Sequence, residues 1–527
     1  MRVAAVALLV VRHACACSFI VANYRIEADE LAHANEFNRR RGPDGTNVHH
    51  ILANGADWTF VHNLLSMTGA VTLQPFVGAN GSIVALFNGE IYNYGSLAHQ
   101  LTGNASEFPS DGYVLIPAYQ RWGWEFVRRL EGEFAIVLLD VAAQRLLLST
   151  DAFSTKPLWH ACWREHGQER IVVATYESVL KRLGAPDATR VMASPNEIAL
   201  LDLRKATDAP GGAPATCSFE QRTPFYTWDL RQYKTHTRDW TATFRDAVLV
   251  RTDRLKHRVF MGLSAGYDSG AIALALKQLD RPFLAYSVRA DESVSVVLQR
   301  SRACESVAEV VFMNMTRADY RAQARWLDAH CEEFRYLRMG RAWWYPHVQD
   351  RRGQPFLFRD ARRYQVKTDG GGTGLSAILA LSRPVRGLIY LSGAGADEII
   401  SDYAIHGRKI NPHSCFNGVF PRELNTSVSS SQNHRQPFFP WCGFYYGAQR
   451  NYLMKDELIA GAHGVEGRYP FLDPRVVQEY LWLSHEVKNA EYKKPIADFL
   501  REAAFPNLWD TKVGFNTVKG LGKGWHK

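Results

Sequence analysis

The stretch VFMGLSAGYDSGAIALAL at residues 259–276 decides the fold of the second half of this chain. It starts as a short apolar run of strand length and passes through a loop of small and hydroxyl residues at 264–269. It then continues as an Ala- and Leu-rich helix over 270–279. A strand, a glycine-containing loop and a helix in succession are typical of parallel α/β sheets, whose ligands bind at the carboxyl ends of the strands. We therefore expect residues 264–269 to lie at a ligand-binding edge.

The loop at residues 264–269 carries groups that suit a phosphate. Backbone N–H groups at a helix N-terminus hold phosphate oxygens, and the hydroxyls of Ser264 and Ser269 add donors. Asp268 is a suitable ligand for a hard cation. The loop lacks the lysine of a Walker motif, and a strand-to-helix turn capped by Asp268 or Ser269 is the alternative interpretation.

A second loop of the same kind follows another apolar run. Residues 387–391 (GLIYL) have strand character and lead into the sequence SGAGADE at 392–398. Two such loops at strand ends predict a site for a nucleotide with Mg²⁺, in which Asp268 and Asp397 share the metal.

The first half of the chain has a different pattern. Apolar or alternating runs of strand length recur between short polar segments, which predicts a β-rich, layered domain. The predicted strands are 18–26, 58–67, 83–87, 134–140, 145–150, 170–175 and 197–203. The pair Asn88-Gly89 is a typical turn signal.

These patterns divide the chain into two α/β domains, at residues 17–204 and 235–527. Pro, Gly, Ala and Thr without periodicity indicate a linker at 205–234. A helix is predicted over 241–255. Glycine- and serine-rich stretches at 369–374 and 425–432 are predicted surface loops, within insertions near 340–375 and 405–445.

Composition excludes several classes of protein. The 527 residues are 46% hydrophobic and 22% charged, which excludes a disordered chain, a collagen and a coiled-coil rod. No apolar run reaches the roughly 18 residues of a membrane span. The net charge of +9 is small for this length and suits anionic small molecules such as nucleotides without requiring nucleic acid. Eight scattered cysteines do not form a disulfide scaffold.

The N-terminus MRVAAVALLVVRHACAC has the pattern of a signal peptide over residues 1–16, with a short extra tail as the alternative. Four N-x-S/T sequons, at Asn80, Asn104, Asn314 and Asn425, suit the secretory pathway. Cleavage after Ala16 would make Cys17 the first residue and place a free α-amine, which can act as a base, beside its thiol.

Five blocks in order, and a sixth near the C-terminus, resemble the glutamine-hydrolysing asparagine synthetases. The resemblance covers most of residues 17–527. The blocks are RGPD at 41–44, FNGEIYN at 87–93, SAGYDS at 264–269, SGAGADE at 392–398, GVEGRYPFLD at 464–473 and KVGF at 512–515. They are similar to the family's RGPD, FNGEIYN, SGGxDS, SGEGADE, GLExRxPFLD and KxxF. The family is usually cytosolic, which is the alternative to secretion.

The resemblance implies a glutaminase in the first domain, with the αββα fold of N-terminal-nucleophile hydrolases. Cys17 would attack the side-chain amide of glutamine, forming a thioester and releasing ammonia. Asn88 and Gly89 would form the oxyanion hole. Glutamine would be bound by Asn88, Gly89, Glu90 and Asp111, with Asp111 holding the α-ammonium.

For the second domain the resemblance implies the ATP-pyrophosphatase fold and an ATP-dependent carbon–nitrogen ligase. ATP would activate aspartate as an acyl-adenylate, which ammonia converts to asparagine with release of AMP. Mg²⁺ would be bound by Asp268 and Asp397, and Lys512 would neutralise charge on the phosphates. The residues implied in ATP binding are Leu263, Ser264, Gly266, Asp268, Ser269, Val288, Ser392 and Gly393. The partners implied are these small molecules and a second copy of the chain as a homodimer.

Three positions depart from the family's pattern. Leu64 stands where the family has an arginine that pairs with the glutamine α-carboxylate. Ala394 replaces a glutamate beside the activated acyl group, and Ala265 replaces a loop glycine, which would be strained if that position required a positive φ. The alternatives to asparagine synthesis are therefore an amidotransferase or ligase acting on another carboxylate, and a nucleotide-binding relative with impaired catalysis.

Overall fold

The computed structural model describes most of the chain beyond the predicted leader. The described residues are 17–204, 217–290, 292–331, 370–381, 387–400, 404–405, 408–409, 419–424, 440–441, 444–446 and 448–509. The leader at 1–16, the serine-rich stretch at 425–432 and Lys512 lie outside this set.

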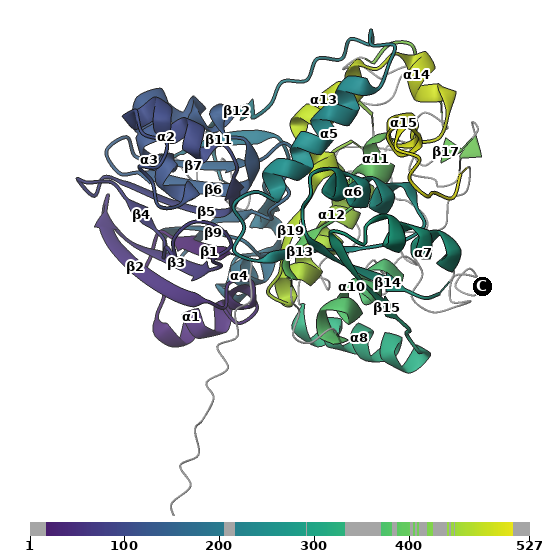
Figure 1. Cartoon of the computed structure of the whole chain (residues 1–527). Coiled ribbons are helices and arrows are strands. Elements are labelled where there is room, and N and C mark those ends of the chain that lie inside the picture. Colours follow the sequence, from purple (N-terminus) through teal and green to yellow (C-terminus); the bar gives the residue numbers. More distant parts are fainter. Residues whose placement is uncertain are drawn as a thin grey trace, which may run out of the picture.

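The N-terminal half is built on two six-stranded antiparallel sheets (Figure 1). The first has the strand order β10-β8-β9-β1-β3-β2 and the second β12-β11-β7-β6-β5-β4. The strands are β1 (Ser18–Ala22), β2 (Gly45–Ala53), β3 (Ala56–Leu64), β4 (Phe76–Val77), β5 (Ile83–Ile91), β6 (Gly132–Asp140), β7 (Arg145–Thr150), β8 (Trp159–Glu165), β9 (Gln168–Ala174), β10 (Val191–Met192), β11 (Glu197–Asp202) and β12 (Phe219–Pro224).

Both faces of the central strands are buried, because helices cover the outer faces of the sheets. Phe19, Leu86 and Val137 belong to the core between the sheets, whereas Ile20 and Phe87 belong to the core that includes the helices. Helices α2 (Tyr94–Thr102) and α3 (Leu115–Trp122) lie on one side, and α1 (Ala28–Ala34) and α4 (Glu177–Arg182) on the other (Figure 1). The predicted layered, β-rich organisation is therefore present.

Two predictions for this half were wrong. Asn88-Gly89 is no turn, because β5 continues through it and pairs with β6, with Asn88 opposite Ala135 and Gly89 opposite Phe134. Part of the predicted linker forms β12, which pairs with β11 and completes the edge of the second sheet.

The C-terminal half is an α/β unit with one parallel sheet, as predicted. The strand order is β15-β14-β13-β16-β19, and every neighbouring pair is parallel. The strands are β13 (Arg258–Gly262), β14 (Phe283–Val288), β15 (Ala308–Met313), β16 (Gly387–Leu391) and β19 (Glu466–Arg468). The helices include α5 (Arg238–Arg251), α6 (Tyr267–Gln278), α7 (Val294–Ala303), α8 (Arg317–His330), α10 (Gly370–Leu381), α11 (Ala396–Ile400), α12 (Ala448–Ala462), α13 (Pro474–Trp482), α14 (His485–Ala490) and α15 (Lys494–Glu502).

The glycine-rich stretch at 369–374 is not a surface loop where it is described. From Gly370 onward it is the first part of α10, which packs against α8 and α12. Leu375, Ile378 and Leu379 are buried in that packing. Burial of the apolar run outweighs the poor helix propensity of glycine, which amounts to about 1 kcal/mol per residue.

Buried ion pairs lock the two halves together. Arg251 on α5 forms ion pairs with Glu133 on β6 at 2.7 Å and with Asp473 at 2.9 Å. Lys156 of the N-terminal half pairs with Glu457 on α12 at 3.3 Å. Removing one partner of such a buried pair typically costs about 3–5 kcal/mol, so these contacts hold α5 and α12 against the N-terminal half.

A disulfide joins Cys162 on β8 to Cys217, which lies two residues before β12. It therefore links a strand of the first sheet to the segment that leads into the edge strand of the second. In the part of the chain that the structure describes, no helix is both long and apolar enough to cross a membrane.

Candidate active sites

Cys17 lies immediately before β1, a central strand of the first sheet, and is buried. Its Sγ accepts a hydrogen bond from the backbone N–H of Leu65 at 3.2 Å. The Arg41 Nε donates to the Cys17 carbonyl at 3.1 Å, which fixes the backbone on the other side. Burial raises the pKa of the thiol, so the sulfur needs a base to become a nucleophile.

The sulfur faces a small cavity of about 40 Å³. This cavity brings together four of the predicted site residues, Cys17, Gly89, Glu90 and Asp111. Leu64, Leu65, Ser66, Met67, Thr68, Phe87, Ser110 and Glu466 also line it. Glu466 belongs to β19 of the C-terminal half, so the cavity is completed by both halves. The sequence predicted no role for Glu466, although it lies within the block at 464–473.

Gly89 occupies a position that only glycine can fill. Its φ is +128°, and a Cβ there would lie 1.8 Å from the Glu133 carbonyl oxygen on the neighbouring strand. The adjacent Asn88 does not line the cavity, but its side chain is buried. The Asn88 Nδ2 has no hydrogen-bond acceptor among the described residues. Burying a donor without an acceptor costs folding free energy. Such a donor is expected where its hydrogen bond is made to a ligand or to a reaction intermediate.

The acidic groups of the cavity are held in different ways. Asp111 accepts hydrogen bonds from the backbone N–H groups of Ile91 and Gly112, each at 2.9 Å. Burial nevertheless raises the pKa of Asp111 to about 7. Glu90 accepts from the Thr68 hydroxyl at 2.9 Å and pairs with Arg468 at 3.0 Å, yet burial raises its pKa well above the ordinary value.

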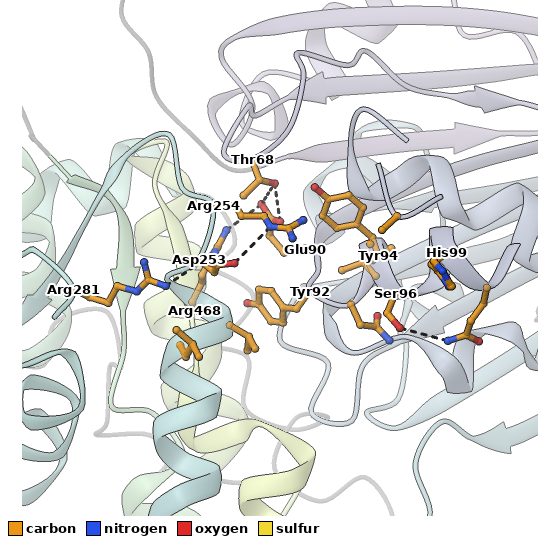
Figure 2. A pocket seen from close by; sticks show the side chains of 17 residues that line it. Thr68, Glu90, Tyr92, Tyr94, Ser96, His99, Asp253, Arg254, Arg281 and Arg468 are labelled. Carbon is orange, nitrogen blue, oxygen red and sulfur yellow. Dashed lines mark hydrogen bonds and ion pairs between the residues drawn. The ribbon is translucent and has the colours of Figure 1, made fainter. Parts of the chain in front are cut away.

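A larger cavity of about 740 Å³ lies between the two halves and shares Thr68 and Glu90 with the Cys17 cavity. Figure 2 shows Tyr94, Ser96 and His99 entering it from α2. Asp253, Arg254, Arg281 and Arg468 enter it from the C-terminal half. No sequence motif predicted this cavity, because its walls come from segments far apart in the chain.

The second candidate site lies where β13 ends and α6 begins. The hydroxyls of Ser264 and Ser269 are 2.9 Å apart, and the Gly266 N–H donates to the Ser264 Oγ at 3.1 Å. Ala265 is not in the left-handed region, so it avoids the strain considered from the sequence. Leu263 and Val288 are buried at the carboxyl ends of β13 and β14.

Arg300 on α7 forms hydrogen bonds with the backbone of this loop. Its Nη1 donates to the carbonyls of Ser264 at 2.6 Å and Gly266 at 2.8 Å. Burial lowers the Arg300 pKa to about 10. A Cβ at Gly270 would lie 2.5 Å from the guanidinium, so this glycine makes room for Arg300. Sequence reasoning missed Arg300, which lies 36 residues after Ser264.

The two predicted phosphate loops meet in space. A Cβ at Gly393 would lie 3.2 Å from the Cβ of Asp268. Ser392 is fixed by its backbone N–H, which donates to the Arg468 carbonyl at 3.0 Å, and by its hydroxyl, which donates to Asp456 at 2.6 Å. The second loop is therefore tied to β19, the same strand that lines the Cys17 cavity.

Lys493 joins the two acids predicted to bind metal. Its Nζ forms ion pairs with Asp268 and with Asp397, the latter at 2.8 Å. Burial favours loss of the Lys493 proton, but the two carboxylates outweigh it and raise the Lys493 pKa above its ordinary value. The sequence had assigned the cation of this site to Lys512, which lies outside the described residues, and had missed Lys493.

Comparison with known proteins shows two kinds of similarity. Residues 15–204 match the glutamine amidotransferase domain family. A protein of Methanocaldococcus jannaschii named putative asparagine synthetase [glutamine-hydrolyzing] 1 is 24% identical over 483 residues, which is 88% of this chain and 77% of that protein. The first part of the chain is thus similar to glutamine amidotransferase domains, and most of its length is similar to a protein named as a glutamine-hydrolysing asparagine synthetase.

Higher identity is confined to shorter segments. A putative asparagine synthetase [glutamine-hydrolyzing] of Mycobacterium tuberculosis (strain ATCC 25618 / H37Rv) is 35% identical over 143 residues, which is 25% of this chain and 22% of the relative. The protein named Amidase chyE of Penicillium rubens is 35% identical over 159 residues, 29% of this chain and 22% of the relative. These matches thus span less than a quarter of the relatives' length.

Proposed function

We propose that this protein is a glutamine-dependent, ATP-consuming amidotransferase that makes asparagine from aspartate. Glutamine, aspartate and ATP would give asparagine, glutamate, AMP and pyrophosphate. On this proposal the N-terminal half has the N-terminal-nucleophile hydrolase fold and the C-terminal half the ATP-pyrophosphatase fold. The observation that carries the proposal is the single cavity that collects Cys17, Gly89, Glu90 and Asp111.

In the proposed glutaminase step the α-amine of Cys17, freed by removal of residues 1–16, accepts the thiol proton. The sulfur then attacks the side-chain carbonyl of glutamine, the C–N bond breaks, and ammonia leaves. Water hydrolyses the resulting thioester to glutamate. Asn88 and Gly89 would stabilise the oxyanion, each donor contributing about 3 kcal/mol. The ionised Asp111 carboxylate would hold the α-ammonium of the substrate.

In the proposed synthetase step ATP supplies the adenylyl group that activates the carboxylate of the second substrate. The loops at 264–269 and 392–393, with Leu263 and Val288, would hold the nucleotide. The described residues contain no cluster of three or more His, Cys, Asp or Glu that would bind a metal alone. Two carboxylates fit Mg²⁺ nonetheless, because this ion is usually held by one or two carboxylates together with substrate phosphates. Asp268 and Asp397 would supply them, and Lys493 would neutralise phosphate charge beside them.

The test uses the chain that begins at Cys17, with the full-length chain for comparison. We expect the shorter chain to release glutamate from glutamine and to release pyrophosphate only when ATP, Mg²⁺ and aspartate are all present. Mass spectrometry should then detect asparagine, with ammonia able to replace glutamine. Absence of glutamate release would refute the first site, and pyrophosphate release that ignores aspartate would refute the assigned substrate.

A second candidate is transfer to a different carboxylate. It is favoured by Ala394, whose N–H donates to the Ser392 Oγ at 3.1 Å and whose side chain has no charge to place near an acyl group. Two of the matched relatives are named amidases rather than synthetases. A panel of carboxylates in the pyrophosphate assay decides between the two, because only the true acceptor stimulates release.

A further inference from the structure

The Cys17 cavity has an unbalanced charge for the substrate proposed above. Glutamine carries an ammonium and a carboxylate on its α-carbon, so its pocket needs both an anion and a cation. The lining provides the carboxylates of Glu90, Asp111 and Glu466 but, among the described residues, no Lys, Arg or His. Leu64, where an arginine would pair with the α-carboxylate, is 5% exposed and apolar.

Three cations contact residues of the lining within the described part of the chain. Arg41 donates to the Cys17 carbonyl, and its guanidinium is already paired with the buried Glu457. Arg468 is fully buried and its guanidinium is already paired with Glu90 at 3.0 Å and with Glu466 at 2.6 Å. A guanidinium held by two carboxylates has little attraction left for a third. The third cation is Lys256, whose Nζ donates to the Ser66 Oγ at 3.0 Å.

Lys256 contacts the cavity lining from the C-terminal half, on the segment between α5 and β13. Its backbone N–H donates to the Met67 carbonyl at 3.3 Å, so main chain and side chain are both anchored at the rim. Ser66 and Met67 line the cavity, and Leu65, the residue before Ser66, holds the Cys17 sulfur. The Lys256 ammonium is therefore bound to a neutral hydroxyl, which a carboxylate can readily replace.

We propose that Lys256 binds the α-carboxylate of the glutamine hydrolysed at Cys17 and takes the place of the arginine that Leu64 replaces. This inference rests on the proposed glutaminase function. Asp111 and Lys256 would then bind the two α-substituents of the substrate from opposite halves of the molecule. The ATP-binding half would thus take part directly in recognising glutamine.

The experiment compares glutamine with its α-carboxamide, which keeps the ammonium and the reacting side chain but lacks the α-carboxylate. We expect Lys256→Ala to raise the KM for glutamine about tenfold or more, with kcat changed less than about threefold. Lys256→Arg should restore most of the affinity. The α-carboxamide should be hydrolysed with the same KM by the wild type and by Lys256→Ala, because it has no carboxylate to lose.

The matched control is Arg258→Ala. Arg258 is an exposed cation two residues away that pairs with Glu309 at 3.6 Å, and its loss should leave the KM for glutamine unchanged. An unchanged KM in Lys256→Ala, or an equal loss with both substrates, would overturn the assignment of Lys256 while leaving the glutaminase proposal standing. A wild-type protein that releases no glutamate from glutamine would overturn both.

Discussion

Asp111 in the Cys17 cavity and the two aspartates of the loop site are held in opposite ways. At the Cys17 cavity Asp111 is bound by backbone N–H groups alone, and burial raises its pKa to about 7. At the loop site Asp268 and Asp397 share the buried Lys493 ammonium. The first site thus has an acid that gains from binding an ammonium. The acids of the second site are already paired with a cation, so binding of a metal or a phosphate there would have to rearrange these ion pairs.

This difference indicates which charged groups each site would bind. A carboxylate that has no cation beside it attracts a positively charged group. Two carboxylates with a lysine between them can instead bind a metal ion and the phosphates that accompany it. The four predictions that follow test this contrast, beginning with the largest expected effect.

Removing the sulfur should separate the two sites. We expect Cys17→Ala to reduce glutamate release from glutamine by roughly 10³-fold or more, because no other group can form the thioester. Pyrophosphate release with ammonia as the nitrogen source should stay within about twofold of wild type. A comparable loss of both activities would show that the sites are not chemically separate.

Removing the cation should affect only the loop site. Lys493→Ala leaves Asp268 and Asp397 without this partner and should reduce pyrophosphate release by about 10²-fold or more, with glutamate release retained. The control is Lys494→Ala, because Lys494 pairs instead with Asp498 at 2.5 Å on the same helix. Equal effects of the two variants in the pyrophosphate assay would contradict the role of Lys493.

Gly89 tests whether the Cys17 cavity depends on one backbone position. In Gly89→Ala the added Cβ would collide with the Glu133 carbonyl at a positive φ, and we expect unfolding free energy to fall by roughly 3 kcal/mol or more. Gly103→Ala also has a positive φ, of +80°, but meets nothing within 4 Å and should cost only about 1 kcal/mol. Urea denaturation of both variants measures the difference, and similar midpoints would refute the steric argument.

The raised pKa of Asp111 predicts that folding stability and glutamine affinity change in opposite directions as the pH rises. Because the native state holds this proton more tightly than the unfolded chain, whose Asp has a pKa of about 3.9, stability from this group falls as pH rises from about 4 to about 7. The ionised form binds ammonium, so the KM for glutamine should fall by about tenfold between about pH 6 and 8. Asp111→Asn should abolish both trends, and a flat KM in the wild type would contradict the assigned role.

The sequence predicted best where a few adjacent residues determine the structure. The apolar runs that became β13 and β16 were recognised, and so were the loops after them, because strand, loop and helix signals are local. The turn predicted at Asn88-Gly89 failed because pairing with β6 outweighs local turn preference. The helix α10 was missed because its glycines are stabilised by burial against α8 and α12.

The site residues also divide into those that local motifs predicted and those that only distant contacts reveal. Cys17, Gly89, Glu90 and Asp111 were named from motifs, and the fold brings all four to one cavity. Glu466, Arg300, Lys493 and Lys256 were missed, because each acts on residues far away in the chain. Nothing in a single sequence indicates which distant cation will contact a given carboxylate or hydroxyl.

By itself the sequence determined a β-rich first half followed by a parallel α/β half, the motifs of the resemblance and the two sets of loop residues, since these depend on short-range patterns of side chains. Only the tertiary structure decided that β19 serves both sites, that Lys493 lies between two acids and that Lys256 reaches the rim of the Cys17 cavity. The physical reason is that electrostatic pairing and burial depend on distances in space, and folding sets those distances across hundreds of residues.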